Sequence, residues 1–262
     1  MAGLALLLLA SCDWTLTPAD SEANAPVSVE RYDRIESLYL TTGDYAALQQ
    51  MNTSFPEQTR TLIEDVLNIG RVNDPDINLK FLKFYQDTTL QTLISEVEQQ
   101  YANMEDIEKD LTRAFEWLRK EIPQLETPQV YAQIGSLDQS IIVGNGLLGI
   151  SLDKYLGSDF PLYLRPDYGY TNGQRDMMRR DYIVPDCLGF YLLSLYPMPQ
   201  YRELSQFERD MHMAKIQWTV NKAMNKNLFG GLYVRCVDHY MKRNKQMGVD
   251  LMLRNNDYRE IR

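Results

Sequence analysis

The chain has 262 residues, is 44% hydrophobic and carries a formal net charge of -9. This length and composition are enough for one domain with a large buried core, and they argue against an intrinsically disordered protein. The acidic balance and the lack of a Lys/Arg stripe argue against nucleic-acid binding, because neutralisation of phosphate charge supplies most of that affinity.

The N-terminus has the pattern of a signal for lipid attachment. An apolar run from Leu4 to Ala10 precedes Ser11 and Cys12, which resembles a bacterial lipobox. We therefore predict a lipoprotein signal peptide at residues 1–11 and a lipid such as palmitate on Cys12. The alternative, an N-terminal helix buried in a core, fits poorly with the polar stretch that follows. The run is also far shorter than the roughly 20 residues of a membrane-spanning helix, so we expect an anchored protein.

Residues 12–28 include two prolines and are predicted to form a flexible tether between the membrane and the domain. An extended piece and an amphipathic turn are predicted at residues 27–40. The sequence Thr42-Gly43-Asp44 then indicates the start of a helix, and a second helix is predicted from Glu57 to Asn68.

Two helices in the middle of the chain are predicted from apolar residues at helical spacing. Their stripes are Leu90, Ile94, Val97 and Tyr101, and then Ile107, Leu111, Ala114, Phe115, Leu118 and Ile122. After Pro128 the pattern changes to short apolar runs bounded by glycines, which is typical of strands. These predicted strands are Val130–Ile134, Ser140–Val143 and Leu147–Leu152.

The rest of the chain is predicted to contain a long surface loop at residues 158–181, followed by helices at Pro185–Leu195 and Ser205–Asn225. Helices, a small sheet and more helices together predict an α+β domain that is mostly helical. This domain is expected to span residues 29–225.

The sequence Gly144-Asn145-Gly146-Leu147-Leu148-Gly149 matches the glycine pattern of dinucleotide-binding sites. Such a site needs a helix that opens at the third glycine and an acidic residue that ends a second strand. Here Gly149 leads into an apolar run, and Asp167 lies in a loop rich in Pro and Tyr. We therefore predict a tight hairpin at these glycines and no nucleotide partner.

Histidine and cysteine are too scarce for the common metal and nucleophile sites. The two histidines, His212 and His239, belong to no H-E-x-x-H motif and no Cys/His cluster. Cys187 and Cys236 are interpreted as buried thiols, with a disulfide between them as the alternative in an oxidising envelope. We expect no metal site, no cofactor and no catalytic constellation.

Two groups of residues leave other functions open. Six aspartates could supply a pair for hydrolysis by general acid–base catalysis without a metal: Asp153, Asp159, Asp167, Asp176, Asp181 and Asp186. Four tyrosines could form a binding platform for a glycan or a peptide: Tyr163, Tyr168, Tyr170 and Tyr182. A carboxylate-dependent hydrolase and a surface glycan- or peptide-binding lipoprotein are therefore kept as alternatives.

Four segments of the chain resemble the gliding-motility lipoprotein B (GldB) family. The central one is LLGISLDKYLGSDFPLY at Leu147–Tyr163; the others are VERYD at residues 29–33, DLTRAFEWLRKEIPQLETP at residues 110–128 and YIVPD at residues 182–186. The resemblance spans residues 29–225, and the lipobox agrees with it.

This resemblance implies a lipoprotein anchored in the envelope of a Gram-negative bacterium, in the outer or the inner membrane, facing the periplasm or the cell surface. The family is needed for gliding and is associated with the secretion machinery that supports it. It is also related to predicted zinc proteases, with the metal motif lost, which implies a zincin-like architecture without the metal site. The helix at Val184–Leu195 would then replace the H-E-x-x-H helix, and its start, Pro185 to Phe190, offers no imidazole.

We therefore expect a non-catalytic protein that binds envelope protein partners in a gliding-motility or secretion assembly. Its recognition surface is expected in a groove beside the Leu147–Leu152 strand, where a partner would bind by strand addition. The candidate residues of this groove are Asp153, Tyr155, Asp159 and Asp186.

The C-terminal segment at residues 226–262 departs from the family pattern. Residues 222–262 hold 9 Lys and Arg against 4 Asp and Glu, whereas the family continues with acidic helical segments. This difference is typical of a truncated or altered tail, such as a frameshift produces. A tail of that kind is expected to pack poorly.

Overall fold

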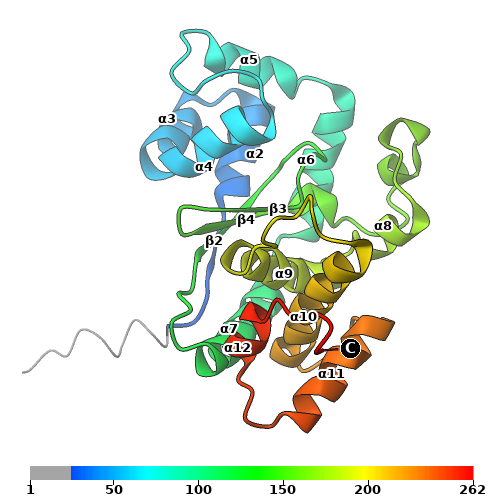
Figure 1. Cartoon of the computed structure of the whole chain (residues 1–262). Helices are drawn as coiled ribbons and strands as arrows, with labels where there is room; N and C mark the ends of the chain where they lie inside the picture. The colour runs from blue at the N-terminus through cyan, green and yellow to red at the C-terminus, as the bar shows by residue number, and fades with distance from the viewer. Residues whose placement is uncertain (1–24, 262) are drawn as a thin grey trace, which may run out of the picture.

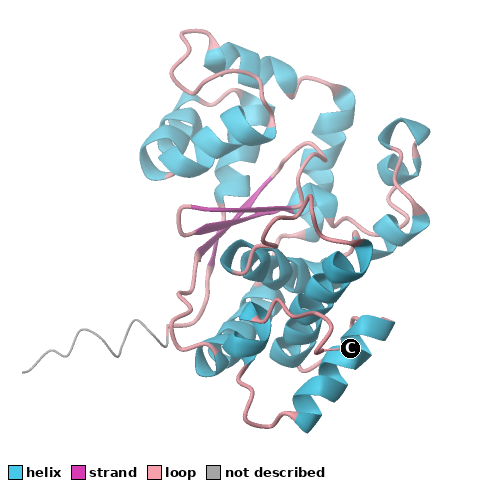
Figure 2. Cartoon of the chain, in the orientation of Figure 1, coloured by secondary structure: helices cyan, strands magenta, loops and turns pink. Residues whose placement is uncertain are grey.

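The computed structural model describes residues 25–261. The predicted signal peptide, the lipid-attachment residue Cys12 and the tether as far as residue 24 lie outside the described residues. The described chain is mostly helical with one small sheet, which confirms the predicted α+β class (Figure 2). Within this part of the chain, no helix combines the length and the apolar character needed to cross a membrane.

Four short strands form a mixed sheet: β1 Val29–Glu30, β2 Gln129–Gln133, β3 Ile141–Gly144 and β4 Leu147–Ser151. Their order across the sheet is β1-β2-β4-β3. β2 runs parallel to both β1 and β4, whereas β3 is antiparallel to β4. β4 is therefore paired on both sides and β3 is an edge strand. The three strands predicted after Pro128 are confirmed.

A two-residue turn at Asn145-Gly146 joins β3 to β4. Both residues have positive φ, 52° for Asn145 and 75° for Gly146, which is the backbone conformation that Asn-Gly favours in tight hairpins. The predicted hairpin is confirmed, and the third glycine of the motif, Gly149, lies within β4.

Helices lie on both sides of the sheet (Figure 1). The first half of the chain forms α2 Tyr32–Thr42, α3 Tyr45–Ser54, α4 Pro56–Thr61, α5 Ile77–Phe84 and α6 Thr88–Gln100, with a π-helical turn, Leu62–Val66, directly after α4. α3 begins where the sequence predicts, because the Asp44 carboxylate accepts a hydrogen bond from the Ala46 N–H at 2.7 Å and so caps the helix.

The sequence predicts only an amphipathic turn where α2 lies, and it predicts no helix where α5 lies. α2 buries Asp33 and Glu36 together with its apolar side chains, so its hydrophobic period is hidden. The Asp33 carboxylate is paired with the Arg31 guanidinium at 2.6 Å, which makes its burial tolerable.

On the other side of the sheet, α9 Ile183–Leu195 contacts β3 and β4, and α7 Glu105–Glu121 and α10 Gln206–Met224 pack on α9 (Figure 1). The predicted stripe of α7 is buried, and Leu111, Phe115 and Leu118 have no exposed surface (0%). α10 is enclosed by α7, α9, α11 and α12, which explains why its buried residues occur around the whole helix. The predicted loop at residues 158–181 contains a short helix, α8 Asn172–Met177.

The tail forms two helices, α11 Leu232–Arg243 and α12 Val249–Arg254, which contact α10. The Lys215 ammonium of α10 donates hydrogen bonds to the carbonyl oxygens of Leu253 at 2.9 Å and Asn255 at 2.7 Å. These bonds satisfy the C-terminal end of α12. The buried apolar side chains of the tail include Val234, Val237, Tyr240, Met252, Leu253 and Ile261. The prediction that this tail packs poorly is therefore wrong.

Candidate functional site

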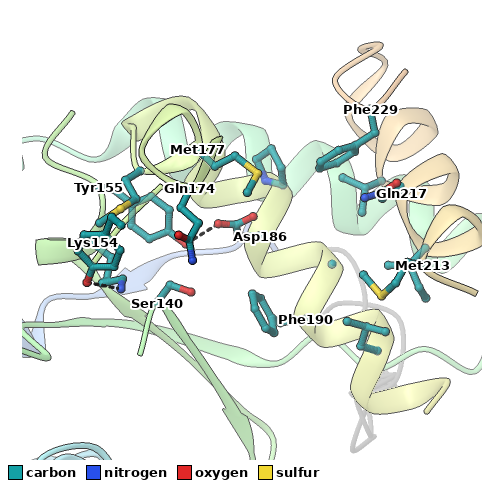
Figure 3. A pocket seen from close by; sticks show the side chains of 17 residues that line it. Ser140, Lys154, Tyr155, Gln174, Met177, Asp186, Phe190, Met213, Gln217 and Phe229 are labelled. Carbon is teal, nitrogen blue, oxygen red and sulfur yellow. Dashed lines mark hydrogen bonds between the residues drawn. The ribbon is translucent and has the colours of Figure 1, made fainter. Parts of the chain in front are cut away.

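A cavity of about 450 Å³ lies beside α9, between the end of the sheet, α8 and α10. Its walls are mostly apolar, with Phe190 of α9 and Met213 of α10 among them (Figure 3). Polar groups come from seven residues: Ser140, which precedes β3, Lys154, Tyr155, Tyr170, Gln174, Asp186 and Gln217. A concave apolar site with few converging polar groups is the usual form of a ligand-binding pocket.

Asp186 and Tyr155 meet at the wall of this cavity. The Tyr155 hydroxyl donates a hydrogen bond of 2.8 Å to the Asp186 carboxylate. Burial raises the pKa of Asp186 to about 6, and the hydrogen bond from Tyr155 opposes that rise. Burial and the Asp186 charge raise the pKa of Tyr155 well above its ordinary value. At neutral pH the cavity therefore holds one carboxylate, bound to a neutral phenol.

Asp153 has a structural position away from the cavity. Its side chain is fully buried (0%), and its carboxylate accepts hydrogen bonds from the N–H groups of Gly135 at 2.7 Å and Leu137 at 2.5 Å. These contacts fix the segment that follows β2. A partner cannot reach Asp153, so its assignment to the groove is wrong.

Asp159 is exposed and lies in a separate depression, together with Arg179 and Arg180. Tyr155 borders both this depression and the cavity. Of the four predicted groove residues, the structure therefore brings only Tyr155 and Asp186 together.

The position predicted for strand addition also needs correction. β4 is paired with β2 on one side and with β3 on the other, so it has no free edge for another strand. The edge strand next to it, β3, lies against α9, and Ser140, at its start, lines the cavity. A partner strand could therefore pair with β3, and not with β4 as predicted.

The residues of the two alternative functions are dispersed. Of the six loop aspartates, Asp186 is the one that lines the cavity. Of the four tyrosines, Tyr163 is buried with 1% exposure, and Tyr168 stacks on Tyr170 with ring centroids 6.2 Å apart. The tyrosines pack on one another and on the core, so they do not form a common exposed platform.

The histidines and cysteines do not gather either. His212 is buried between the Tyr196 carbonyl and the Tyr258 hydroxyl, whereas His239 is exposed on α11. Cys187 is buried, Cys236 is half-buried, and both are free thiols. Among residues 25–261, no three His, Cys, Asp or Glu side chains lie in a group suited to a metal ion.

Several cavity residues have no signal in the sequence that points to a site. They include Lys154, Phe190, Met213, Gln217 and Phe229. Phe190 is 44% exposed although α9 is otherwise strongly apolar. The sequence of α9 does not show that Phe190 is exposed, because most of its apolar neighbours are buried and only the packing distinguishes it from them.

A sequence model of one family, described as gliding motility protein GldB, matches residues 13–227. The match includes the sheet, α9 and every residue that lines the cavity except Phe229. No curated protein and no solved structure shows a match to the chain. The family match, which covers most of the chain, indicates a lipoprotein of gliding-motility machinery. The chain belongs to the gliding motility protein GldB family.

Proposed function

We propose that this protein is a lipid-anchored component of the cell envelope that binds a protein partner and catalyses no reaction. The partner would enter the cavity beside α9 and pair with the free edge of β3. The observation that carries this proposal is the position of a mostly apolar cavity directly next to an unpaired edge strand. Such an edge supplies backbone hydrogen bonds, and an adjacent pocket supplies specificity.

The hydrogen-bond pattern of β3 identifies the groups that a partner can use. The Ser140 carbonyl accepts a hydrogen bond from the Ser151 N–H at 3.0 Å, and the register pairs Ile142 with Gly149. Hydrogen-bonded and non-hydrogen-bonded pairs alternate along an antiparallel ladder. The N–H and C=O groups of Ile141 and Val143 therefore point away from β4, toward a partner strand.

The polar groups of the cavity favour binding over hydrolysis. Asp186 is the single carboxylate in its described lining, so the pair of carboxyl groups that a metal-free hydrolase needs is not available there. The Lys154 ammonium donates hydrogen bonds to the Leu137 carbonyl at 3.2 Å and the Tyr170 hydroxyl at 3.0 Å. It holds neighbouring segments together and does not activate Asp186.

We also propose that the domain is a zincin-like fold that has lost its metal site. α9 lies against β3 and lines the cavity with Asp186, Gly189 and Phe190. A zinc-protease helix presents two histidines four residues apart, and positions 186 and 190 have this spacing but hold Asp and Phe. Catalytic zinc takes three protein ligands, which this lining does not offer. One zinc ion per chain in the purified protein would contradict this part of the proposal.

Lipid attachment at Cys12 is the remaining part of the proposal. The family match begins at residue 13, directly after Cys12. An anchor would confine the domain to the membrane surface and so raise its effective concentration near membrane-bound partners. Labelled palmitate should appear on the wild-type protein and be lost in Cys12→Ser.

The binding role is tested by filling the cavity. A Cβ at Gly189 would meet no atom within 4 Å, so Gly189→Leu should add bulk to the cavity without disturbing the core. Lipidated protein purified from membranes should lose its partner in this variant. Gly248→Leu, at the start of α12, is the matched control because a Cβ there also meets nothing. Equal partner recovery with both variants would refute the cavity as the binding site.

A further inference from the structure

A second cavity, of about 550 Å³, lies between the C-terminal part of α10 and α11. It shares only Phe229 with the cavity described above. Four cationic side chains and one carboxylate line it: Lys222, Lys226, Arg235, Lys242 and Asp238. We refer to it as the basic pocket.

The ion pairs of the basic pocket leave it with excess positive charge. Asp238 accepts hydrogen bonds from Trp218 Nε1 at 3.0 Å and forms ion pairs with Lys222 at 3.0 Å and Lys242 at 2.6 Å. These contacts hold the pKa of Asp238 well below its ordinary value, so this carboxylate stays ionised. Lys226 is paired with Asp110 of α7 at 3.3 Å. Four cations thus face two carboxylates, and a ligand with negative charge is favoured.

The N-terminal segment and the basic pocket are both connected to α7. The Val27 N–H donates to Thr112 Oγ1 at 2.9 Å, and the Val29 N–H donates to Glu108 Oε1 at 2.8 Å. Both acceptors belong to α7, and Asp110, which holds Lys226, lies between them in sequence. At 3.6 residues per turn, position 110 faces the opposite side of α7 from positions 108 and 112. The entering chain and the edge of the basic pocket therefore lie at the same level of α7 but on opposite sides of it. Figure 1 shows α7 and α11 in the same half of the molecule.

Twelve residues separate Cys12 from Ala25, where the described structure begins. A chain of this length reaches at most about 40 Å, so a lipid on Cys12 would hold the domain close enough for the basic pocket to touch the membrane. The exposed side chains of Lys242, Arg243 and Lys245 extend the positive surface along the end of α11. Charges more than about 8 Å from this surface are largely screened at physiological salt.

We propose that the basic pocket binds the phosphate-bearing headgroup of an anionic phospholipid in the membrane that holds the anchor. This inference rests on the lipid anchor of the proposed function. The acidic net charge of -9 predicts repulsion from such a surface, but the positive charge is concentrated in the basic pocket and at the end of α11. Headgroup binding would turn this end of the domain toward the membrane and leave the β3 edge accessible to a partner.

The test uses the full chain with Cys12→Ser, so that acylation does not contribute to membrane binding. We expect it to sediment with vesicles of phosphatidylcholine mixed with phosphatidylglycerol, and much less with phosphatidylcholine alone. The double variant Lys226→Gln/Arg235→Gln should bind the mixed vesicles at least about tenfold more weakly, since each basic residue near an anionic surface adds to the binding energy. Lys80→Gln/Lys83→Gln, on α5 in the other half of the molecule, removes the same charge and should bind as before.

Three results would overturn the proposal. Equal binding to both vesicle types, or equal loss in the two double variants, would show that the basic pocket does not recognise the headgroup. Stronger displacement from the vesicles by inorganic phosphate than by sodium chloride at the same ionic strength would assign the pocket to a soluble anion. A fourth outcome separates this proposal from the anchor: failure of palmitate labelling at Cys12 with vesicle binding intact would refute the anchor but not the headgroup site.

Discussion

The Tyr155 hydroxyl and the Asp186 carboxylate are joined by a hydrogen bond of 2.8 Å. It connects the turn that follows β4 to the first turn of α9, so residues 31 positions apart in sequence meet at one cavity wall. This contact fixes the direction of the carboxylate, and burial sets its ionisation.

Asp186→Asn should stabilise the protein at neutral pH. The pKa of Asp186 is raised from 3.8 to about 6, so the folded chain holds this proton more tightly than the unfolded chain. Stability from this group is therefore present below about pH 4 and lost as the pH rises to about 6. We expect the variant to gain about 1 to 3 kcal/mol near pH 7.5 and nothing near pH 4, as measured by urea unfolding.

The matched control for this prediction is Asp159→Asn. Asp159 is exposed, and its substitution should change the free energy of unfolding by less than about 0.5 kcal/mol at either pH. If Asp186→Asn raised the free energy of unfolding equally near pH 4 and near pH 7.5, the raised pKa of Asp186 would be contradicted.

Asp153→Asn should destabilise the fold. Burial raises the pKa of Asp153, as it does for Asp186, although the backbone hydrogen bonds from Gly135 and Leu137 oppose the rise. The difference is that an asparagine can accept only one of these two bonds, and its NH₂ group would face the other N–H. We expect a loss of about 2 to 4 kcal/mol in chemical unfolding. The Asp167 side chain is 74% exposed, so Asp167→Asn should leave the free energy of unfolding almost unchanged. Wild-type stability in Asp153→Asn would show that the carboxylate has no structural role.

Lys215→Met should loosen the tail. Without the ammonium, the carbonyl oxygens of Leu253 and Asn255 lose their donor, which should cost about 1 to 3 kcal/mol. Hydrogen exchange should speed up most in α12 and the residues that follow. Lys245→Met, at an exposed position, is the control. Unchanged exchange in α12 would mean that the contact with α10 does not hold the tail.

Gly149→Ala should strain the sheet. A Cβ at this position would lie 2.5 Å from the Tyr131 ring, and β4 cannot shift because it is paired on both sides. We expect a loss of about 1 to 3 kcal/mol in thermal unfolding. Gly144→Ala, where a Cβ meets nothing within 4 Å, should cost much less. Similar melting temperatures for the two variants would contradict the close contact.

The elements that the sequence predicts correctly depend on local patterns. The apolar stripe of α7 and the Asn145-Gly146 turn each contain their full signal within a few residues. α10 is also predicted close to its observed bounds. Its apolar residues do not define one buried side, because neighbours enclose the helix and Lys215 and His212 are buried in it. The hydrophobic periodicity of α2 is likewise weak, because Asp33 and Glu36 are buried on its inner side.

The candidate site is predicted only in part because its geometry depends on distant pairings. Asp153 and Asp186 are both aspartates near the sheet, but two backbone N–H groups reach Asp153 and a phenol reaches Asp186. The sequence does not specify which of these partners each carboxylate meets. Likewise, the sequence identifies β3 and β4 as strands but not that β4 lies between β2 and β3.

Partner binding at the β3 edge can be tested by a backbone substitution in β3 itself. The Val143 N–H points away from β4, so Val143→Pro should remove a donor from the free edge while the β3–β4 hydrogen bonds remain. The measurement is cross-linking in intact cells, with a photoreactive residue in place of Phe190 at the cavity wall. We expect a discrete protein adduct that disappears with Val143→Pro in a folded chain. An adduct formed at equal yield with and without the proline would contradict partner binding at this edge.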